Sequence, residues 1–108
     1  MTSVKQANES YEYGGHDYET VAVSQTDQVL GGVGAKGDFL TRLILNNITV
    51  ATADVTLTDG ATAIVIQTGA SAPLGPVVVE IGARAVTGPW KVTTGAGVTV
   101  VAVGQFSA

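Results

Sequence analysis

The chain has 108 residues with a net charge of −4, and only 13% of its residues are charged. This length predicts one domain with a modest core and leaves little room for a doubly wound dinucleotide-binding domain. The acidic balance argues against a nucleic-acid partner, because phosphate backbones attract basic surfaces. Since the sequence contains no cysteine, disulfides, thiolate metal sites and a cysteine nucleophile are excluded.

Apolar residues make up 45% of the sequence, yet no run of them approaches the ~20 residues of a membrane helix. Residues 1–15 also lack the apolar centre of a secretory signal. We therefore expect a soluble protein without a membrane partner, made in a cytoplasm-like compartment. A mildly apolar surface with so little charge favours coverage by protein partners, and the alternative is an ordinary β surface rich in Val, Ala and Thr.

Residues 1–19 differ from the rest of the chain, because they hold all the tyrosines and the only histidine but show no apolar periodicity. We predict an extended N-terminal arm over residues 1–19 and a β domain over residues 20–108. The arm contains Tyr11, Tyr13, His16 and Tyr18, which are either anchors for a partner or solvated tail residues. One histidine on an arm makes a poor metal site, so we expect no metal.

Residues 29–40, VLGGVGAKGDFL, contain the G-x-G-x-x-G spacing of dinucleotide-binding loops. That fingerprint requires a helix after the glycines and a second parallel strand, whereas the rest of the chain has hairpin-like spacing. We interpret the glycines as a turn that leads into a strand beginning at Asp38. This interpretation predicts a positive φ at Gly34 or Gly37 and no bound nucleotide or other cofactor.

Short β-branched runs separated by turn residues predict an all-β protein, an antiparallel sandwich or small barrel of about eight strands. The predicted strands cover residues 20–24, 28–31, 38–50, 54–58, 61–67, 76–82, 90–93 and 97–106. Segment 38–50 also has apolar residues on one helical face, but Asn46, Asn47 and the β-branched residues after them oppose a long helix. A strand is therefore favoured there.

Two patterns indicate how the strands are covered. Over residues 54–58 the apolar side chains take one face, whereas over residues 98–104 both faces are largely apolar, as is typical of a strand covered on both sides. The run 77–81 is similar apart from Glu80. Residues 58–61, TDGA, predict a tight hairpin, because Asp-Gly tolerates the positive φ of a primed turn.

Candidate catalytic groups are sparse, and we expect no enzymatic activity and no small-molecule substrate. A Ser-His-Asp arrangement would need His16, which lies on the arm rather than on a rigid element. Asp54 and Asp59 could form an acid–base pair, but a strand end and a turn explain both. Trp90 is either a core or edge anchor at a strand start or a contact for a partner. Arg42 could pair across an interface with an acid such as Glu80.

The second half of the chain resembles small all-β virion proteins of tailed bacteriophages. The resemblance covers roughly residues 37–106 and lies in strands and turns rather than in a catalytic signature. The stretches that carry it are GDFLTRL (37–43), TDG (58–60), GPWKVTTGAGV (88–98) and GQF (104–106). It implies that residues 38–50 form a strand and that the sandwich is of the jelly-roll or β-tulip kind.

Within that family the chain is most similar to head decoration or cement proteins. The resemblance implies a structural protein on the outer capsid surface of a virion, assembled in the host cytoplasm. Its partners would be the major capsid protein and further copies of itself, as a trimer or less readily a dimer. The alternatives are a tail-tube, head-closure or fibre-associated protein and, from another class, a carbohydrate-binding β module.

Overall fold

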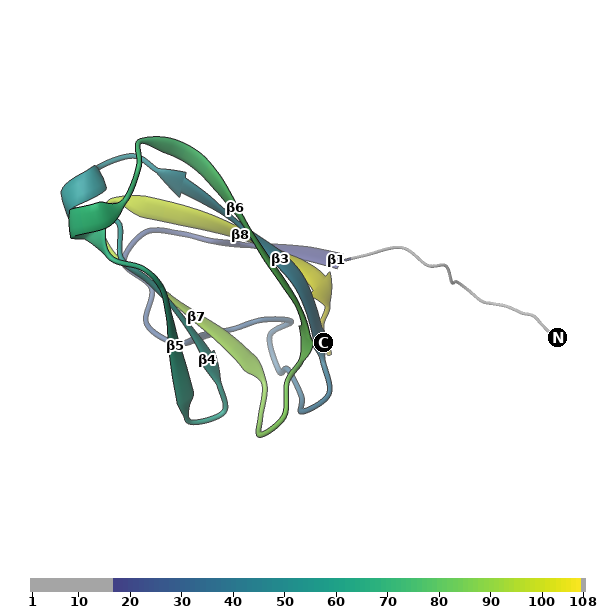
Figure 1. Ribbon diagram of the computed structural model, residues 1–108. Helices are drawn as coiled ribbons and strands as arrows, with labels where there is room; N and C mark the ends of the chain where they lie inside the picture. The colour runs from purple at the N-terminus through teal and green to yellow at the C-terminus, as the bar shows by residue number, and fades with distance from the viewer. Residues whose placement is uncertain (1–16, 108) are drawn as a thin grey trace, which may run out of the picture.

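A computed structural model describes residues 17–107, which form two antiparallel sheets of four strands each. This confirms the predicted all-β sandwich. In Figure 1 the sheets lie as two layers, and two short 3₁₀ turns sit together at one end. The elements are β1 (Asp17–Val21), β2 (Gln28–Val29), β3 (Phe39–Asn47), η2 (Val50–Thr52), β4 (Val55–Asp59), β5 (Thr62–Gln67), η3 (Gly69–Ser71), β6 (Gly75–Arg84), β7 (Trp90–Thr94) and β8 (Val98–Gln105).

The strand order is that of a jelly roll. One sheet has the order β1-β8-β3-β6 and the other has the order β2-β7-β4-β5. The first strand pairs with the eighth, the second with the seventh, the third with the sixth and the fourth with the fifth. The chain is therefore one long antiparallel hairpin with its tip between β4 and β5, rolled so that β8 meets β3 and β7 meets β4.

The core lies between the two layers and is built by alternation along the strands. In β4 the buried Val55 and Leu57 alternate with partly exposed threonines, as the period-2 pattern predicts. β8 buries Val98, Val100 and Ala102 in the same way. The leucines of β3 and the side chains of Trp90 and Val92 in β7 fill the space between the layers, so both sheets contribute to one continuous core.

The observed strands lie close to the predicted ones, with two informative differences. β3 ends at Asn47 rather than at residue 50, because the chain turns there into η2. β1 begins at Asp17, inside the segment predicted to be an arm. Residues Asp17–Val21 pair with β8 from Gly104 back to Val100, so Tyr18 belongs to the sheet rather than to the arm.

The glycine-rich segment before β3 is a turn and not a nucleotide loop. Gly34 and Gly37 have φ of 66° and 94°, which confirms the predicted positive φ. The element that follows is the strand β3, whereas a dinucleotide fingerprint requires a helix there. Asp38 is the last residue of this turn, immediately before β3.

The tip of the long hairpin is the predicted tight turn. Asp59 pairs with Thr62, so the loop consists of Gly60 and Ala61 alone. Gly60 has a φ of 60° and Ala61 is not among the residues with positive φ, as expected for a type II′ turn. The aspartate that the sequence placed inside the turn closes β4 instead.

Comparing Gly34→Ala with Gly37→Ala separates the cost of backbone strain from the cost of a Cβ that crowds its neighbours. A Cβ in left-handed backbone costs about 1–2 kcal/mol at either position. At Gly34 it also meets Pro89 and Val29, whereas at Gly37 nothing lies within 4 Å. In urea unfolding we therefore expect a loss of about 1 kcal/mol for Gly37→Ala and a larger loss for Gly34→Ala. Equal losses would contradict the close packing of the turn.

Candidate functional site

The side chain of Asp59 is buried at the end of the sandwich where the chain crosses from β6 to β7. Its carboxylate accepts hydrogen bonds from the backbone N–H groups of Val86, Thr87 and Gly88, at 2.9, 3.1 and 3.2 Å. The hydroxyl of Thr87 donates to the carbonyl oxygen of Asp59, at 2.8 Å. Charge-assisted bonds of this kind are strong, so Asp59 fixes the crossing loop in place.

Asp38 ties three segments together at the same end. Its carboxylate accepts from the N–H of Ala35, at 3.0 Å, and from the N–H and hydroxyl of Ser107, at 2.9 and 2.7 Å. Its carbonyl oxygen accepts from the N–H of Ala85, at 2.8 Å, and from Nε1 of Trp90, at 3.0 Å. The glycine turn, the C-terminal segment and the crossing loop are thus joined through one residue.

The buried carboxyls of Asp38 and Asp59 both have a pKa below the ordinary value of 3.8. Burial is the largest single influence, and it raises the pKa because it penalises the charged form. The hydrogen bonds from Ala35 and Ser107, and those from the crossing loop, favour the charged form and together outweigh burial. Both groups are therefore held as carboxylates for structural reasons.

Asp54 and Asp59 do not form the acid–base pair that could be imagined from the sequence. They flank and end β4, so they lie at opposite ends of that strand. The carboxylate of Asp54 accepts from the N–H of Gly69, at 2.6 Å, and so holds η3. Both residues therefore lie at ends of β4, as the strand-end explanation expects, and neither lies inside the two-residue loop.

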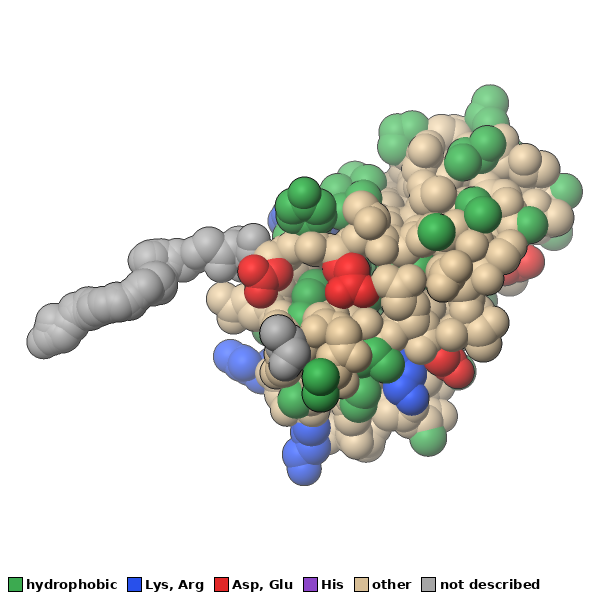
Figure 2. Space-filling model, turned by 180° about the vertical axis from the view of Figure 1, so that it is seen from behind, with side chains coloured by type: hydrophobic (Ala, Val, Ile, Leu, Met, Phe, Trp, Pro, Cys, Tyr) green, Lys and Arg blue, Asp and Glu red, His purple; other side chains and the backbone are tan. Residues whose placement is uncertain are grey.

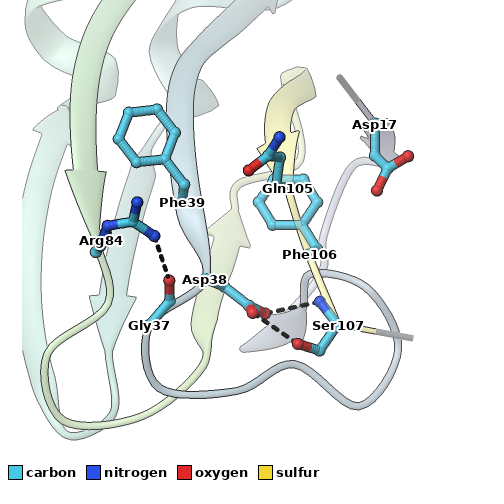
Figure 3. Close-up of a pocket in the computed structure, with 8 residues that line it drawn as sticks. All are labelled: Asp17, Gly37, Asp38, Phe39, Arg84, Gln105, Phe106 and Ser107. Atoms are coloured by element: carbon cyan, nitrogen blue, oxygen red, sulfur yellow. Dashed lines mark hydrogen bonds between the residues drawn. The ribbon is translucent and has the colours of Figure 1, made fainter. Parts of the chain in front are cut away.

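A shallow hollow of about 260 Å³ opens beside Asp38. Figure 3 shows Arg84 next to Phe39 on one side and Asp17 on the other. The guanidinium of Arg84 lies 5.7 Å from the centre of the Phe39 ring and donates to the carbonyl oxygen of Gly37, at 3.4 Å. Asp17 and Arg84 are both exposed, and the buried carboxylate of Asp38 is already hydrogen-bonded to Ala35 and Ser107. The hollow offers no prepared position for a ligand.

The described residues hold no group of three or more His, Cys, Asp or Glu side chains that could bind a metal ion. Over residues 17–107 no helix has the length and apolar character needed to cross a membrane.

The surface with the clearest binding character is the outer side of the β1-β8-β3-β6 sheet. Residues opposite each other in antiparallel strands point to the same side, so the register lines up a row that runs Thr20, Val101, Ile44 and Val78 across all four strands. The next row places Tyr18 beside Val103. We call the apolar members of these rows the outer face, and they are Tyr18, Ile44, Val78, Val101 and Val103.

The outer face is uncovered in the described chain. Val78 is 57% exposed and Tyr18 is 71% exposed, and the other members are partly exposed between their neighbours. Antiparallel sheets that meet water on one side normally carry polar residues there. Residues 98–104 were expected to be covered on both sides, but the sandwich covers only one. A second cover would therefore have to come from outside the described residues.

Charge is sparse on this side of the sheet. Arg42 and Glu80 lie opposite each other on β3 and β6 and form an ion pair at 3.0 Å, within one chain rather than across an interface. Their side chains are 39% and 66% exposed, so the pair adds little stability. Figure 2 shows one side of the whole molecule, where hydrophobic side chains are scattered among uncharged atoms and acidic and basic side chains lie between them.

The predicted partner-binding residues have different outcomes. Trp90 is only 4% exposed and its indole is hydrogen-bonded to Asp38, so the partner contact is corrected and the core-anchor alternative is confirmed. Tyr18 lies exposed on the outer face and stays a candidate. Tyr11, Tyr13 and His16 lie outside the described residues.

Most of the outer face was not singled out from the sequence. Val101 and Val103 lie in a run with two apolar faces, and that pattern is the available signal. Ile44 and Val78 could not be joined to them, because a strand's neighbours depend on strand order and register.

Comparison of the chain with models of protein families, with curated proteins and with solved structures found no match. No relative therefore assigns a role to the outer face or to the hollow.

Acid should weaken the fold through the two buried carboxyls. Since their folded pKa lies below 3.8, their contribution is complete above that value and is lost as the pH falls through the lower folded pKa. We expect the free energy of unfolding, measured in urea, to fall from about pH 5 to about pH 3. Asp59→Asn should lower stability at neutral pH by about 2–3 kcal/mol and flatten this pH dependence.

The control is Asp17→Asn, which removes the same charge from an exposed strand residue. It should leave both the stability at neutral pH and the acid slope nearly unchanged. An equal effect of the two substitutions would mean that overall charge, and not the crossing-loop hydrogen bonds, governs the acid response.

Proposed function

We propose that this protein is a structural component of a larger assembly and acts by covering part of a partner's surface with its outer face. The observation that carries the proposal is the outer face, whose apolar side chains come from all four strands of one sheet and which the sandwich leaves bare. Contiguous apolar surface on a small protein is costly in water and typical of interaction sites. Removing it from water on docking would supply the binding energy.

The assembly that the sequence favours is the head of a tailed bacteriophage. Jelly rolls occur in viral capsid proteins, lectins and cupins, so the strand order alone does not select one function. The resemblance of residues 37–106 to small phage virion proteins favours the first of these. We accordingly propose a decoration protein on the outer surface of the capsid, with the major capsid protein and further copies of the same chain as partners.

The mechanism would be mechanical rather than chemical. A rigid sandwich that contacts neighbouring shell subunits holds them together, and each copy needs only a modest affinity. Many copies on one shell act multivalently, so the assembled layer is more stable than any single contact. The buried carboxylates of Asp38 and Asp59 hold the loops at one end of the sandwich, and such a preformed structure would lower the entropic cost of docking.

The outer face is tested by one substitution at an exposed valine. Val78→Lys places a charge at the β6 end of the apolar row, where docking would have to strip it of water. We expect at least a roughly tenfold loss of affinity for expanded empty capsids in a co-sedimentation assay. Stability should change little, because the side chain is exposed in the free protein.

The matched control is Val86→Lys, which adds the same charge at a valine that is 70% exposed in the crossing loop. It should bind capsids like the natural chain. Equal binding by both variants would refute docking through the outer face. The number of copies in a purified particle gives a further test, since hundreds indicate the shell, whereas six or twelve indicate a tail or connector and contradict decoration.

A further inference from the structure

The four edge strands of the sandwich differ in how well they are protected against pairing with another chain. Natural sheets protect their edges by charge, proline, bulges or shortness. β1 carries Asp17 and Glu19, and β2 has only two residues. β6 contains Pro76, Glu80 and a bulge at Gly82, whose φ is 60°. The fourth edge strand, β5, has neither charge nor proline, and its one register shift, at Ile66, lies beyond the exposed residues 62–65.

β5 has the sequence TAIVIQ, which is uncharged and rich in β-branched residues. Its residues from Thr62 to Val65 are all exposed, including Ile64 at 42% and Val65 at 66%. Ile64 lies opposite the buried Leu57, so it points to the inner side of the sheet and yet stays partly open to water. Such an edge is a template for the addition of a strand.

We propose that β5 is the self-association edge of this protein, where two copies pair β5 to β5 in antiparallel orientation about a two-fold axis. The result is one continuous eight-stranded sheet that spans both molecules. This inference rests on the self-association in the proposed function and assigns it to a single strand.

The hairpin geometry fixes which backbone groups are free. Asp59 and Thr62 form the pair that closes the two-residue loop, and such a pair exchanges hydrogen bonds. Because the direction alternates along a strand, Ala63 and Val65 turn their N–H and C=O groups away from β4. Among the described residues, no loop backbone group bonds to β5. A second strand would satisfy these groups.

The charges of the chain favour a second copy of the same protein as the molecule that pairs with the edge of β5. Two molecules that each carry −4 repel one another unless they meet where charge is absent. Residues 61–68 are all uncharged, and the neighbouring strand β4 presents Thr56 and Thr58 on its outer side. An acidic or basic peptide would find no complementary group along this edge.

The two-fold arrangement is also self-complementary in shape. An axis perpendicular to the sheet keeps the inner sides of both copies together. Ala63 of each copy then pairs with Val65 of the other. In each such pair the outward N–H and C=O groups of both residues are hydrogen-bonded. Ile64 meets Ile64 of the partner on the inner side, where both are partly exposed. A contact of one short strand is small, so we expect a dimer that dissociates on dilution.

A charge-swap experiment tests the predicted register. In Ile64→Lys or Ile64→Glu, like charges face each other across the two-fold axis, so each variant alone should dimerise at least roughly tenfold more weakly than the natural chain in sedimentation. Mixing the two variants should restore dimers as a heterodimer. The control pair, Val33→Lys and Val33→Glu, alters a valine 70% exposed in the glycine turn and should leave dimerisation unchanged.

Because the chain has no cysteine, single introduced thiols report proximity directly. In the proposed dimer the two Ile64 residues face each other as a non-hydrogen-bonded pair, because Ala63 and Val65 supply the backbone bonds. Residues of such a pair are close enough for a disulfide, so Ile64→Cys should form a covalent dimer under mild oxidation. Val65→Cys should do so more slowly, since it faces Ala63 of the partner. Val78→Cys, on the outer face, should stay monomeric.

Several outcomes would overturn the inference. A natural chain that is monomeric at high concentration has no self-association edge, and rapid cross-linking of Val78→Cys would place self-association on the outer face. Failure of the mixed Ile64 variants to recover dimers, with unfolding midpoints unchanged, would reject the register. A monomer that still binds capsids refutes this inference alone, whereas a dimer that ignores capsids refutes only the proposed function.

Discussion

The fold depends on how the chain is held where it passes between the two sheets. The loop from β6 to β7 has backbone N–H groups that cannot bond within either sheet. The carboxylate of Asp59 accepts three of them, and the backbone of Asp38 holds both ends of the loop through Ala85 and the indole of Trp90. With these groups satisfied, the loop avoids the larger cost of unpaired buried N–H groups, and the layers keep a fixed spacing.

Local features of this architecture follow from the sequence. Alternation and turn chemistry act over a few residues, so they place strands such as β4 and β7 to within a residue or two. The positive φ at Gly34 and Gly37 is likewise predictable, because only glycine adopts it at little cost. Even the ambiguous segment before Asn47 is resolved correctly by counting the residues that oppose a helix.

Features that depend on residues far apart in the chain cannot be predicted from the sequence. The partners of Asp59 lie 27 to 29 residues further along the chain, and nothing near them in sequence indicates the contact. Trp90 has a polar indole that suits either an interface or a core, and only its bond to Asp38 decides between them. The outer face needed both strand order and register, since its members come from four strands that are not consecutive.

The nested hairpin also has a consequence for the order of folding. The pair β4–β5 closes a loop of two residues, whereas β1–β8 joins the two ends of the domain, so the entropy of loop closure favours the tip first. The earliest hairpin then carries the least protected edge strand. Nascent chains at high concentration would meet through β5 before their cores are complete, so the rate of synthesis bears directly on the yield of correctly folded protein.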